Sequence, residues 1–256
     1  MEIKILGCSG AKSVGRSPTN FLIDNRMLID CGSVVSKLSS KDIGDRLECM
    51  LLTHSHFDHI MELPFLLEIL IQEVKKQFYV FASENSINSL KSNVFNYECW
   101  PNLFEIAKEE NIDLKLVEFK ENEQFDVGEY KITPVPVNHT IPSHGFIIDN
   151  ADVSVGFTGD TYITDLFWEK CNGIESLKAV IVDVSFPSNM KESADVTKHL
   201  STDLFFSELE KLNNKELEVY VSHMKPQFED EIRNEIAEFN THFNITILED
   251  GMTLKV

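Results

Sequence analysis

One short segment constrains this chain more than any other feature. Three histidines and an aspartate, His54, His56, Asp58 and His59, lie within six consecutive positions, directly after the apolar run 47–53. A nearly continuous apolar run is typical of a strand that is buried on both faces. Imidazole and carboxylate groups are costly to bury without partners, and they are the ligands that zinc and similar divalent ions prefer. The segment therefore predicts a metal centre at the end of a buried strand.

The spacing within this segment divides the donors between two ions. In an extended loop, His54 and His56 lie on the same side of the chain and can share one metal. Asp58 and His59 come where the loop is expected to turn into a helix, and they can reach a second metal close by. Six residues cannot fill two coordination shells, so we expect further ligands at strand ends downstream.

Three later segments place a metal-binding residue type directly after a predicted strand. A polar residue in that position is more often a turn or a cap, but its recurrence after three strands favours one shared site. We therefore expect these residues to complete the two shells. They are His139 after the strand 129–137, Asp160 after the strand 152–158 and His223 after the strand 217–222.

The pattern of apolar residues predicts a four-layer α/β fold. Two blocks of strands, each flanked by helices, indicate an αββα sandwich. No repeat or long Pro/Gly/Ser-rich linker interrupts the chain, so residues 1–256 are expected to form a single domain. The other expected strands are 2–6, 19–24, 27–31, 78–82, 114–119, 144–149, 178–184 and 244–248, and the expected helices are 62–76, 84–96, 101–110, 164–171, 202–212 and 229–240.

Composition narrows the class of protein. The net charge of −19 argues against a nucleic acid partner, because proteins that grip a phosphate backbone usually carry a basic patch. No apolar run approaches the roughly 20 residues that cross a bilayer, and the N-terminus lacks a signal-like stretch. We therefore expect a cytoplasmic protein with no membrane association. The five cysteines form no CxxC pair, which argues against a disulfide framework or a cysteine-rich zinc site.

The order of these motifs resembles that of the metallo-β-lactamase superfamily. The chain has an HxHxDH segment, a lone histidine, the sequence Gly159-Asp160-Thr161 and a late histidine, and Leu28-Ile29-Asp30-Cys31-Gly32 follows the opening hairpin. This resemblance implies that two divalent ions are bridged by Asp160 and by a hydroxide. It also implies the ligand sets, which are His54, His56 and His139 for the first metal, and Asp58, His59 and His223 for the second.

Within the superfamily, three stretches are similar to the class II cyclic nucleotide phosphodiesterases. This narrower resemblance implies a metal-dependent phosphodiesterase that opens 3′,5′-cyclic nucleotides, and hence a small-molecule phosphodiester substrate. Ser201 stands where the family often has threonine, and Ser143-His144-Gly145 replaces a stretch of small residues, so the departures concern the substrate more than the chemistry. The three stretches are Val135-Pro136-Val137-Asn138-His139 with Gly145-Phe146-Ile147-Ile148, Lys198-His199-Leu200-Ser201 and Ser222-His223-Met224-Lys225-Pro226.

The remaining candidates receive roles in this predicted reaction. Two divalent ions can activate a water molecule and stabilise the charge of an in-line displacement. His199 is the candidate general acid or phosphate-binding group, and Lys225 is a second candidate contact for the substrate. Asp58 is counted as a catalytic residue as well as a ligand. Asp30 and Asp183 are expected to orient the ligands from behind.

Several alternatives stay open. The runner-up function is a tRNA 3′-end-processing endonuclease or another phosphoester hydrolase of this fold, although the net charge and the lack of a Gly/Pro-rich protruding arm argue against tRNA. From a different class, a di-iron redox module would usually show a carboxylate-modified ligand set and a flavin partner. Zinc is the expected metal, and manganese or iron fits the same ligands. The strongly apolar helix 62–76 leaves a homodimer open.

Overall fold

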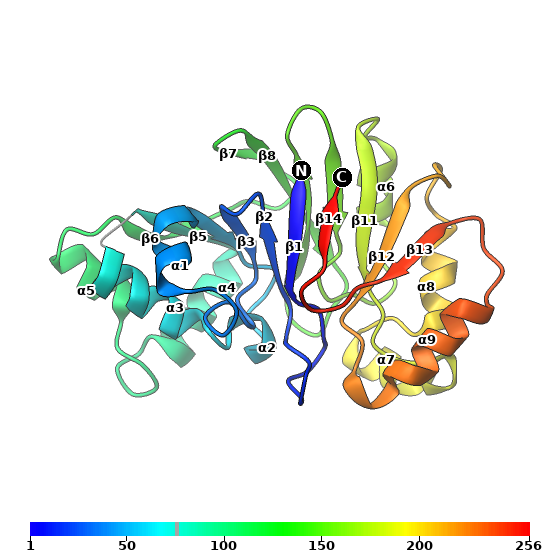
Figure 1. The fold of residues 1–256 in the computed structure, drawn as a ribbon, viewed down its shortest axis with the longest axis horizontal. Coiled ribbons are helices and arrows are strands. Elements are labelled where there is room, and N and C mark those ends of the chain that lie inside the picture. Colours follow the sequence, from blue (N-terminus) through cyan, green and yellow to red (C-terminus); the bar gives the residue numbers. More distant parts are fainter. Residues whose placement is uncertain (75–76) are drawn as a thin grey trace.

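The computed structural model describes residues 1–74 and 77–256, which form two facing β-sheets covered by helices (Figure 1). Each sheet in the described part of the chain has seven strands, and helices line its outer side, so the predicted αββα sandwich is confirmed. The first and last strands of the chain pair at the centre of the molecule, where the two termini lie close together (Figure 1).

The first sheet is built mainly from the N-terminal half. Its strands, in spatial order, are β14 (Thr253–Lys255), β1 (Glu2–Gly7), β2 (Asn20–Ile23), β3 (Met27–Ile29), β4 (Cys49–Leu51), β5 (Phe78–Ala82) and β6 (Leu114–Glu118). The helical segments of this half are α1 (Ser40–Arg46), α2 (Phe57–Ile60), α3 (Leu63–Ile69), α4 (Glu84–Ser89) and α5 (Leu103–Glu109), with π-helical turns η1 (Leu70–Val74) and η2 (Leu90–Val94).

The second sheet is built from the C-terminal half. Its strands, in spatial order, are β13 (Asn244–Ile247), β12 (Glu218–Ser222), β11 (Leu177–Asp183), β10 (Ser154–Phe157), β9 (Ser143–Asp149), β8 (Tyr130–Val137) and β7 (Phe125–Val127). Its helices are α6 (Leu166–Asn172), α7 (Lys191–Thr197), α8 (Thr202–Leu209) and α9 (Glu229–Glu238), with short 3₁₀ turns η3 (Ser188–Met190) and η4 (Pro226–Phe228).

Three apolar cores hold the four layers together. The central core lies between the sheets and includes Phe21, Phe146 and Phe157, all of them buried. A second core packs the first sheet against its helices, and a third packs Trp168 and Phe205 against the second sheet. Burying each such side chain contributes about 1.5–3 kcal/mol relative to leaving it exposed. None of the helices in the described ranges has the length and apolar character needed to span a membrane.

The direction of the strands decides where the functional residues meet. β3 to β6 run parallel in the first sheet, and β10 to β13 run parallel in the second. β8 runs in the same direction as β10, because both pair antiparallel with β9. In each sheet the segments that follow these strands therefore emerge at one edge, and α2, which follows β4, lies at the lower edge between the two helical layers (Figure 1).

Some predicted boundaries were wrong. The expected helix 62–76 ends its regular part at Ile69 and continues as the π-helical turn η1, while residues 75–76 lie outside the described residues. The expected helix 84–96 also divides, into α4 and η2. The residue pattern of neither stretch shows where hydrogen bonding changes from i→i−4 to i→i−5. The elements α1, α7, β7 and β14 were not predicted, because three to seven residues are too few to show a period.

Candidate metal centre

The segment after β4 gathers its imidazoles where the chain turns into α2. His56 is the N-cap of this helix, with an extended backbone (φ −64°, ψ 151°), and His54 precedes it in the loop. The Nε2 atom of His54 lies 3.0 Å from Nδ1 of His56. The Nε2 atom of His139, which follows β8, lies 3.1 Å from the same Nδ1 atom. Three imidazole nitrogens from two strand ends thus converge on one point.

Asp160 lies between this group and a second group of donors. Its Oδ2 atom is 3.6 Å from Nε2 of His54 and 3.1 Å from Nε2 of His59, and its Oδ1 atom is 3.3 Å from Nε2 of His223. Oδ2 of Asp58 lies 3.4 Å from Nε2 of His223. The structure therefore brings together all seven residues that were predicted to be metal ligands. The donor atoms of each group, His54, His56, His139 and Asp160, and Asp58, His59, Asp160 and His223, lie within 4.8 Å of one another.

The spacing of these atoms fits divalent metal ions. A tetrahedral zinc ion with ligands at about 2.0–2.1 Å places neighbouring ligand atoms about 3.3 Å apart, close to the separations given above. The Nε2 atom of His223 is buried and has no hydrogen-bond partner in the described part of the chain. A buried polar atom without a partner costs about 1–3 kcal/mol, and a cation among these donors would remove that cost. The donor set therefore suits a divalent metal.

The nitrogens that face away from the centre are held by hydrogen bonds. Nδ1 of His59 lies 2.7 Å from Oδ2 of Asp30, which also accepts from the Thr53 hydroxyl. Nδ1 of His139 donates to the carbonyl of Lys198 at 2.9 Å. Because a carbonyl only accepts, this bond leaves the lone pair of the His139 Nε2 atom free for a metal. The expected orienting contact from Asp30 is thus present.

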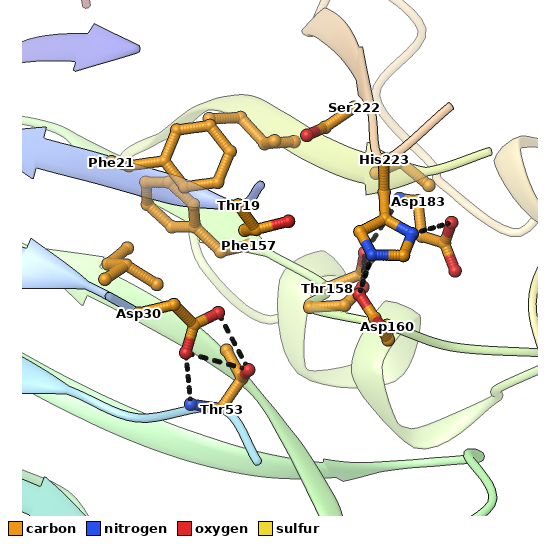
Figure 2. A pocket seen from close by; sticks show the side chains of 14 residues that line it. Thr19, Phe21, Asp30, Thr53, Phe157, Thr158, Asp160, Asp183, Ser222 and His223 are labelled. Carbon is orange, nitrogen blue, oxygen red and sulfur yellow. Dashed lines mark hydrogen bonds and ion pairs between the residues drawn. The ribbon is translucent and has the colours of Figure 1, made fainter. Parts of the chain in front are cut away.

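His199 packs directly against the ligand rings. Its Nδ1 atom lies 2.7 Å from Oδ2 of Asp183, and its ring stacks on that of His223 with centroids 5.0 Å apart. Its ring also meets that of His139 edge to face at 4.9 Å. Asp183 accepts a hydrogen bond from the hydroxyl of Ser185, a residue that was not predicted from the sequence. Figure 2 shows Asp160 and Asp183 on either side of the His223 ring. His199 is therefore fixed beside the donors with its Nε2 atom unused by Asp183.

The local electrostatics separate the histidines into two kinds. Burial lowers the pKa of His54 far below its usual value and that of His139 to about 4, so both rings are neutral and able to bind a metal. Burial also opposes the charged form of His223, but nearby carboxylates, Asp160 first among them, raise its pKa to about 9. The pKa of Asp160 stays well below its ordinary value because His223 and His59 outweigh its burial. The carboxylates thus supply negative charge that favours a cation.

Three residues at this site have strained backbone conformations. Asp30, Lys198 and His223 adopt left-handed conformations with φ of 58°, 56° and 66°. Such conformations cost about 1–3 kcal/mol each in residues other than glycine, and they tend to occur where geometry serves a function. The loop after β1 also touches the site, because a Cβ atom on Gly10 would lie 2.5 Å from the His223 carbonyl. A glycine after a strand is an ordinary turn signal, so this contact cannot be predicted from the sequence pattern.

Lys225 and His144 make contacts outside the two donor groups. The Nζ atom of Lys225 donates to the carbonyl of Gly10 at 2.7 Å, so the lysine braces the β1 loop, and its contact with substrate stays a prediction. His144 is buried with Nε2 3.2 Å from Oε1 of Glu121 and its ring edge-on to Phe119. Among the described residues His144 belongs to neither donor group.

A small cavity lies behind the donors, between the two sheets (Figure 2). Its lining includes Phe21, Phe157, Asp30, Asp183 and His223, and its volume is about 20 Å³. That volume holds about one water molecule. A substrate must therefore approach the donors from the outer side, where the strand-end loops are exposed.

Comparison with known proteins agrees with this architecture. A family model described as a β-lactamase superfamily domain matches residues 25–224. The chain is 23% identical over 203 residues to a probable 3′,5′-cyclic-nucleotide phosphodiesterase of Yersinia pestis, covering 70% of this chain and 57% of the relative. It is 26% identical over 157 residues to a ribonuclease Z of Archaeoglobus fulgidus, covering 58% of this chain and 48% of the relative. The chain thus spans about half the length of these curated relatives.

A solved structure shows the same fold over the whole chain. Unliganded yeast PDE1 superposes with a TM-score of 0.81 at 20% identity, covering 100% of this chain and 99% of that one. At this identity the likeness establishes the fold alone, whereas the family model covers most of the chain. The predicted resemblance is confirmed, and the chain belongs to the metallo-β-lactamase superfamily.

Proposed function

We propose that the protein is a divalent-metal-dependent phosphodiesterase that hydrolyses 3′,5′-cyclic nucleotides. The observation that carries this proposal is the convergence of the two donor groups, which share Asp160, beside the fixed ring of His199. We assign one ion to His54, His56 and His139 and a second to Asp58, His59 and His223. Zinc is the ion that this donor set suits best, and manganese or iron is compatible with it. The relative in Yersinia pestis, a probable cyclic-nucleotide phosphodiesterase, supports the substrate class.

When bound, two neighbouring divalent ions lower the pKa of a water molecule and neutralise charge that develops on a phosphoryl group. The residues of the chain supply the rest of the chemistry. Asp183 holds His199 through Nδ1, which leaves Nε2 as the atom that exchanges a proton with the substrate. Opening a cyclic phosphodiester releases an alkoxide, and a general acid beside the centre can protonate it. Asp58 places its carboxylate at the same centre, 3.4 Å from His223.

A small phosphodiester suits the charge of the chain. With a net charge of −19, the protein repels a long polyanion, whereas a single phosphate can be held by the cations of the centre alone. Processing of tRNA 3′ ends is the second candidate, favoured by the match to ribonuclease Z of Archaeoglobus fulgidus. A di-iron redox function has less support, because five of the six terminal ligands of the proposed centre are histidines and the matched relatives described above are a phosphodiesterase and a ribonuclease.

The test is hydrolysis of cyclic AMP and cyclic GMP with and without added manganese or zinc, beside a precursor tRNA and an Asp160→Ala control. Metal-dependent opening of a cyclic nucleotide that is lost in Asp160→Ala would support the proposal. Cleavage of the tRNA without turnover of either cyclic nucleotide would replace it with the second candidate. If none of the three compounds is turned over, both candidate functions are excluded, and only the assignment to the superfamily remains.

A further inference from the structure

Phe57 differs from the other exposed aromatic side chains of the described residues. Its side chain is 69% exposed. Phe65 packs edge-on against Trp100, with centroids 5.2 Å apart, and Phe239 stacks on Phe206. The hydroxyl of Tyr97 donates to Oε2 of Glu105 at 2.7 Å. Among the exposed aromatic side chains that the structure describes, Phe57 makes neither a ring contact nor a side-chain hydrogen bond. Covering a phenylalanine ring that lies in water gains free energy, so a flat apolar group can bind there.

The backbone places Phe57 next to two of the proposed metal ligands. Phe57 is the first residue of α2 and stands between His56 and Asp58, whose side chains belong to the two donor groups. The N–H of His59 donates to the carbonyl of His56 at 3.0 Å, and the N–H of Cys31 donates to the carbonyl of His59 at 2.7 Å. These bonds tie the turn to the first sheet, so the position of Phe57 relative to the donors is set by the fold.

Other exposed apolar side chains lie on segments that contact the donors or their neighbours. Val14 lies in the β1 loop that touches His223, and Val196 lies two residues before Lys198, whose carbonyl binds His139. Ile163 is exposed, and its carbonyl accepts from Asn138, the neighbour of His139. With Phe57, these make four of the seven large exposed apolar side chains in the described residues. Exposed apolar side chains are therefore present on several of the segments near the donors.

We propose that Phe57 is a substrate-binding residue that stacks on the base of a nucleotide substrate and so favours substrates with a base over substrates without one. This inference rests on the proposed function and extends it. A nucleotide combines a phosphate, which suits the donor centre, with a flat base, which suits an exposed aromatic ring. The cavity behind the donors has room for about one water molecule, so the base stays at the outer rim.

Stacking has a predictable effect on selectivity. Every base has a π-face, so an aromatic ring binds bases with little discrimination between them. The side chains of Phe57, Val14, Ile163 and Val196 offer no hydrogen-bonding group that could read a base edge. Cyclic AMP and cyclic GMP should therefore be hydrolysed with kcat/KM values within about tenfold of each other.

The experiment compares Phe57→Ala, Phe57→Trp and the matched control Phe65→Ala on two substrates. The substrates are cyclic AMP and ribose 3′,5′-cyclic phosphate, which lacks the base. Phe57→Ala should raise KM for cyclic AMP about tenfold to a hundredfold with little change in kcat, and should leave the base-free substrate unaffected. Phe57→Trp should restore the KM, and Phe65→Ala should resemble the wild type on both substrates.

The outcomes separate this inference from the proposed function. If the wild type hydrolyses cyclic AMP and Phe57→Ala changes neither KM, or changes both substrates equally, stacking is wrong and the proposed function stands. If Phe57→Ala converts a dimer to a monomer without a base-dependent change in KM, a second copy covers the ring and the inference is wrong. If the wild type has no phosphodiesterase activity, equilibrium dialysis measures the binding of AMP and of ribose 5-phosphate to the wild type and to Phe57→Ala, and this comparison tests stacking. Weaker binding of AMP alone by Phe57→Ala then supports stacking, and equal binding overturns it.

Discussion

The Asp30 carboxylate lies 2.7 Å from Nδ1 of His59, and both side chains are fully buried. Asp30 adopts a φ of 58°, a conformation that asparagine tolerates, so Asp30→Asn changes the charge without straining the backbone. Loss of the carboxylate should weaken zinc binding about tenfold to a hundredfold, because His59 loses the group that orients it. Zinc titration against a chelating indicator measures this effect.

The matched control is Asp24→Asn. Asp24 has a similar φ of 45°, but it accepts from Glu2 and Tyr130 instead of a histidine. The zinc affinity of the Asp24→Asn variant should equal that of the wild type. Equal zinc affinity of Asp30→Asn and wild type would show that Asp30 does not orient a ligand.

His199→Gln tests the proton-transfer role. Removing a general acid should lower kcat about a hundredfold to ten-thousandfold, while the metal content stays unchanged because His199 is not assigned as a ligand. His242, which is exposed, provides the matched control His242→Gln. Steady-state kinetics with metal analysis of the same samples makes the comparison. Loss of metal from His199→Gln would make His199 a ligand instead.

Gly10→Ala tests the contact between the β1 loop and His223. The added Cβ atom would lie 2.5 Å from the His223 carbonyl and 2.9 Å from its Nδ1 atom, so the histidine must move. We expect weaker metal binding and at least tenfold lower kcat, since small displacements of catalytic groups are costly. At Gly173 an added Cβ atom would come no closer than 3.4 Å to the atoms around it, so Gly173→Ala should behave as the wild type. Normal metal binding and normal kcat in Gly10→Ala would contradict the contact.

Glu229 predicts a pH-dependent stability. It binds Arg16 of the β1 loop at 2.6 Å and Arg233 at 2.8 Å, and these guanidinium groups, Arg16 first, hold its pKa below 4.5 despite partial burial. A depressed pKa means that the stabilisation is present above pH 4.5 and is lost as the pH falls through the folded-state value. Glu229→Gln should therefore cost about 1–2 kcal/mol at pH 7, with the smaller values expected because Arg16 is partly exposed.

Urea denaturation of wild type and Glu229→Gln over a range of pH measures this difference. The gap between their free energies of unfolding should narrow as the pH falls below 4.5. A gap that stays constant with pH would assign the effect to packing instead of charge.

Much of the fold and the site could be predicted, because each proposed ligand obeys a local rule. His139, Asp160 and His223 each follow a buried strand, and parallel strands bring their ends to one edge. The contacts that orient these residues depend on distant segments. The hydroxyl of Ser185 lies 3.0 Å from Nδ1 of His223 because β11 and β12 pair, and no local pattern indicates this contact.

Other contacts and elements could not be predicted from local patterns, because they also depend on distant segments of the chain. The Nζ atom of Lys225 donates to the carbonyl of Gly10, which lies near the opposite end of the chain, and no local pattern indicates this contact. The three residues of β14 form a strand because β1 offers them a free edge. Apolar periodicity predicts that one face of the segment 62–72 is buried, whereas its change to π-helical hydrogen bonding at Leu70 depends on the surrounding packing.

The metal content of the purified protein tests the proposed dinuclear centre most directly. Mass-spectrometric metal analysis, after dialysis to remove loosely bound ions, should find about two divalent ions per chain. Asp160→Ala should retain clearly fewer, because Asp160 is shared by both donor groups. Less than one ion per chain in the wild type, or full retention by Asp160→Ala, would contradict the dinuclear centre.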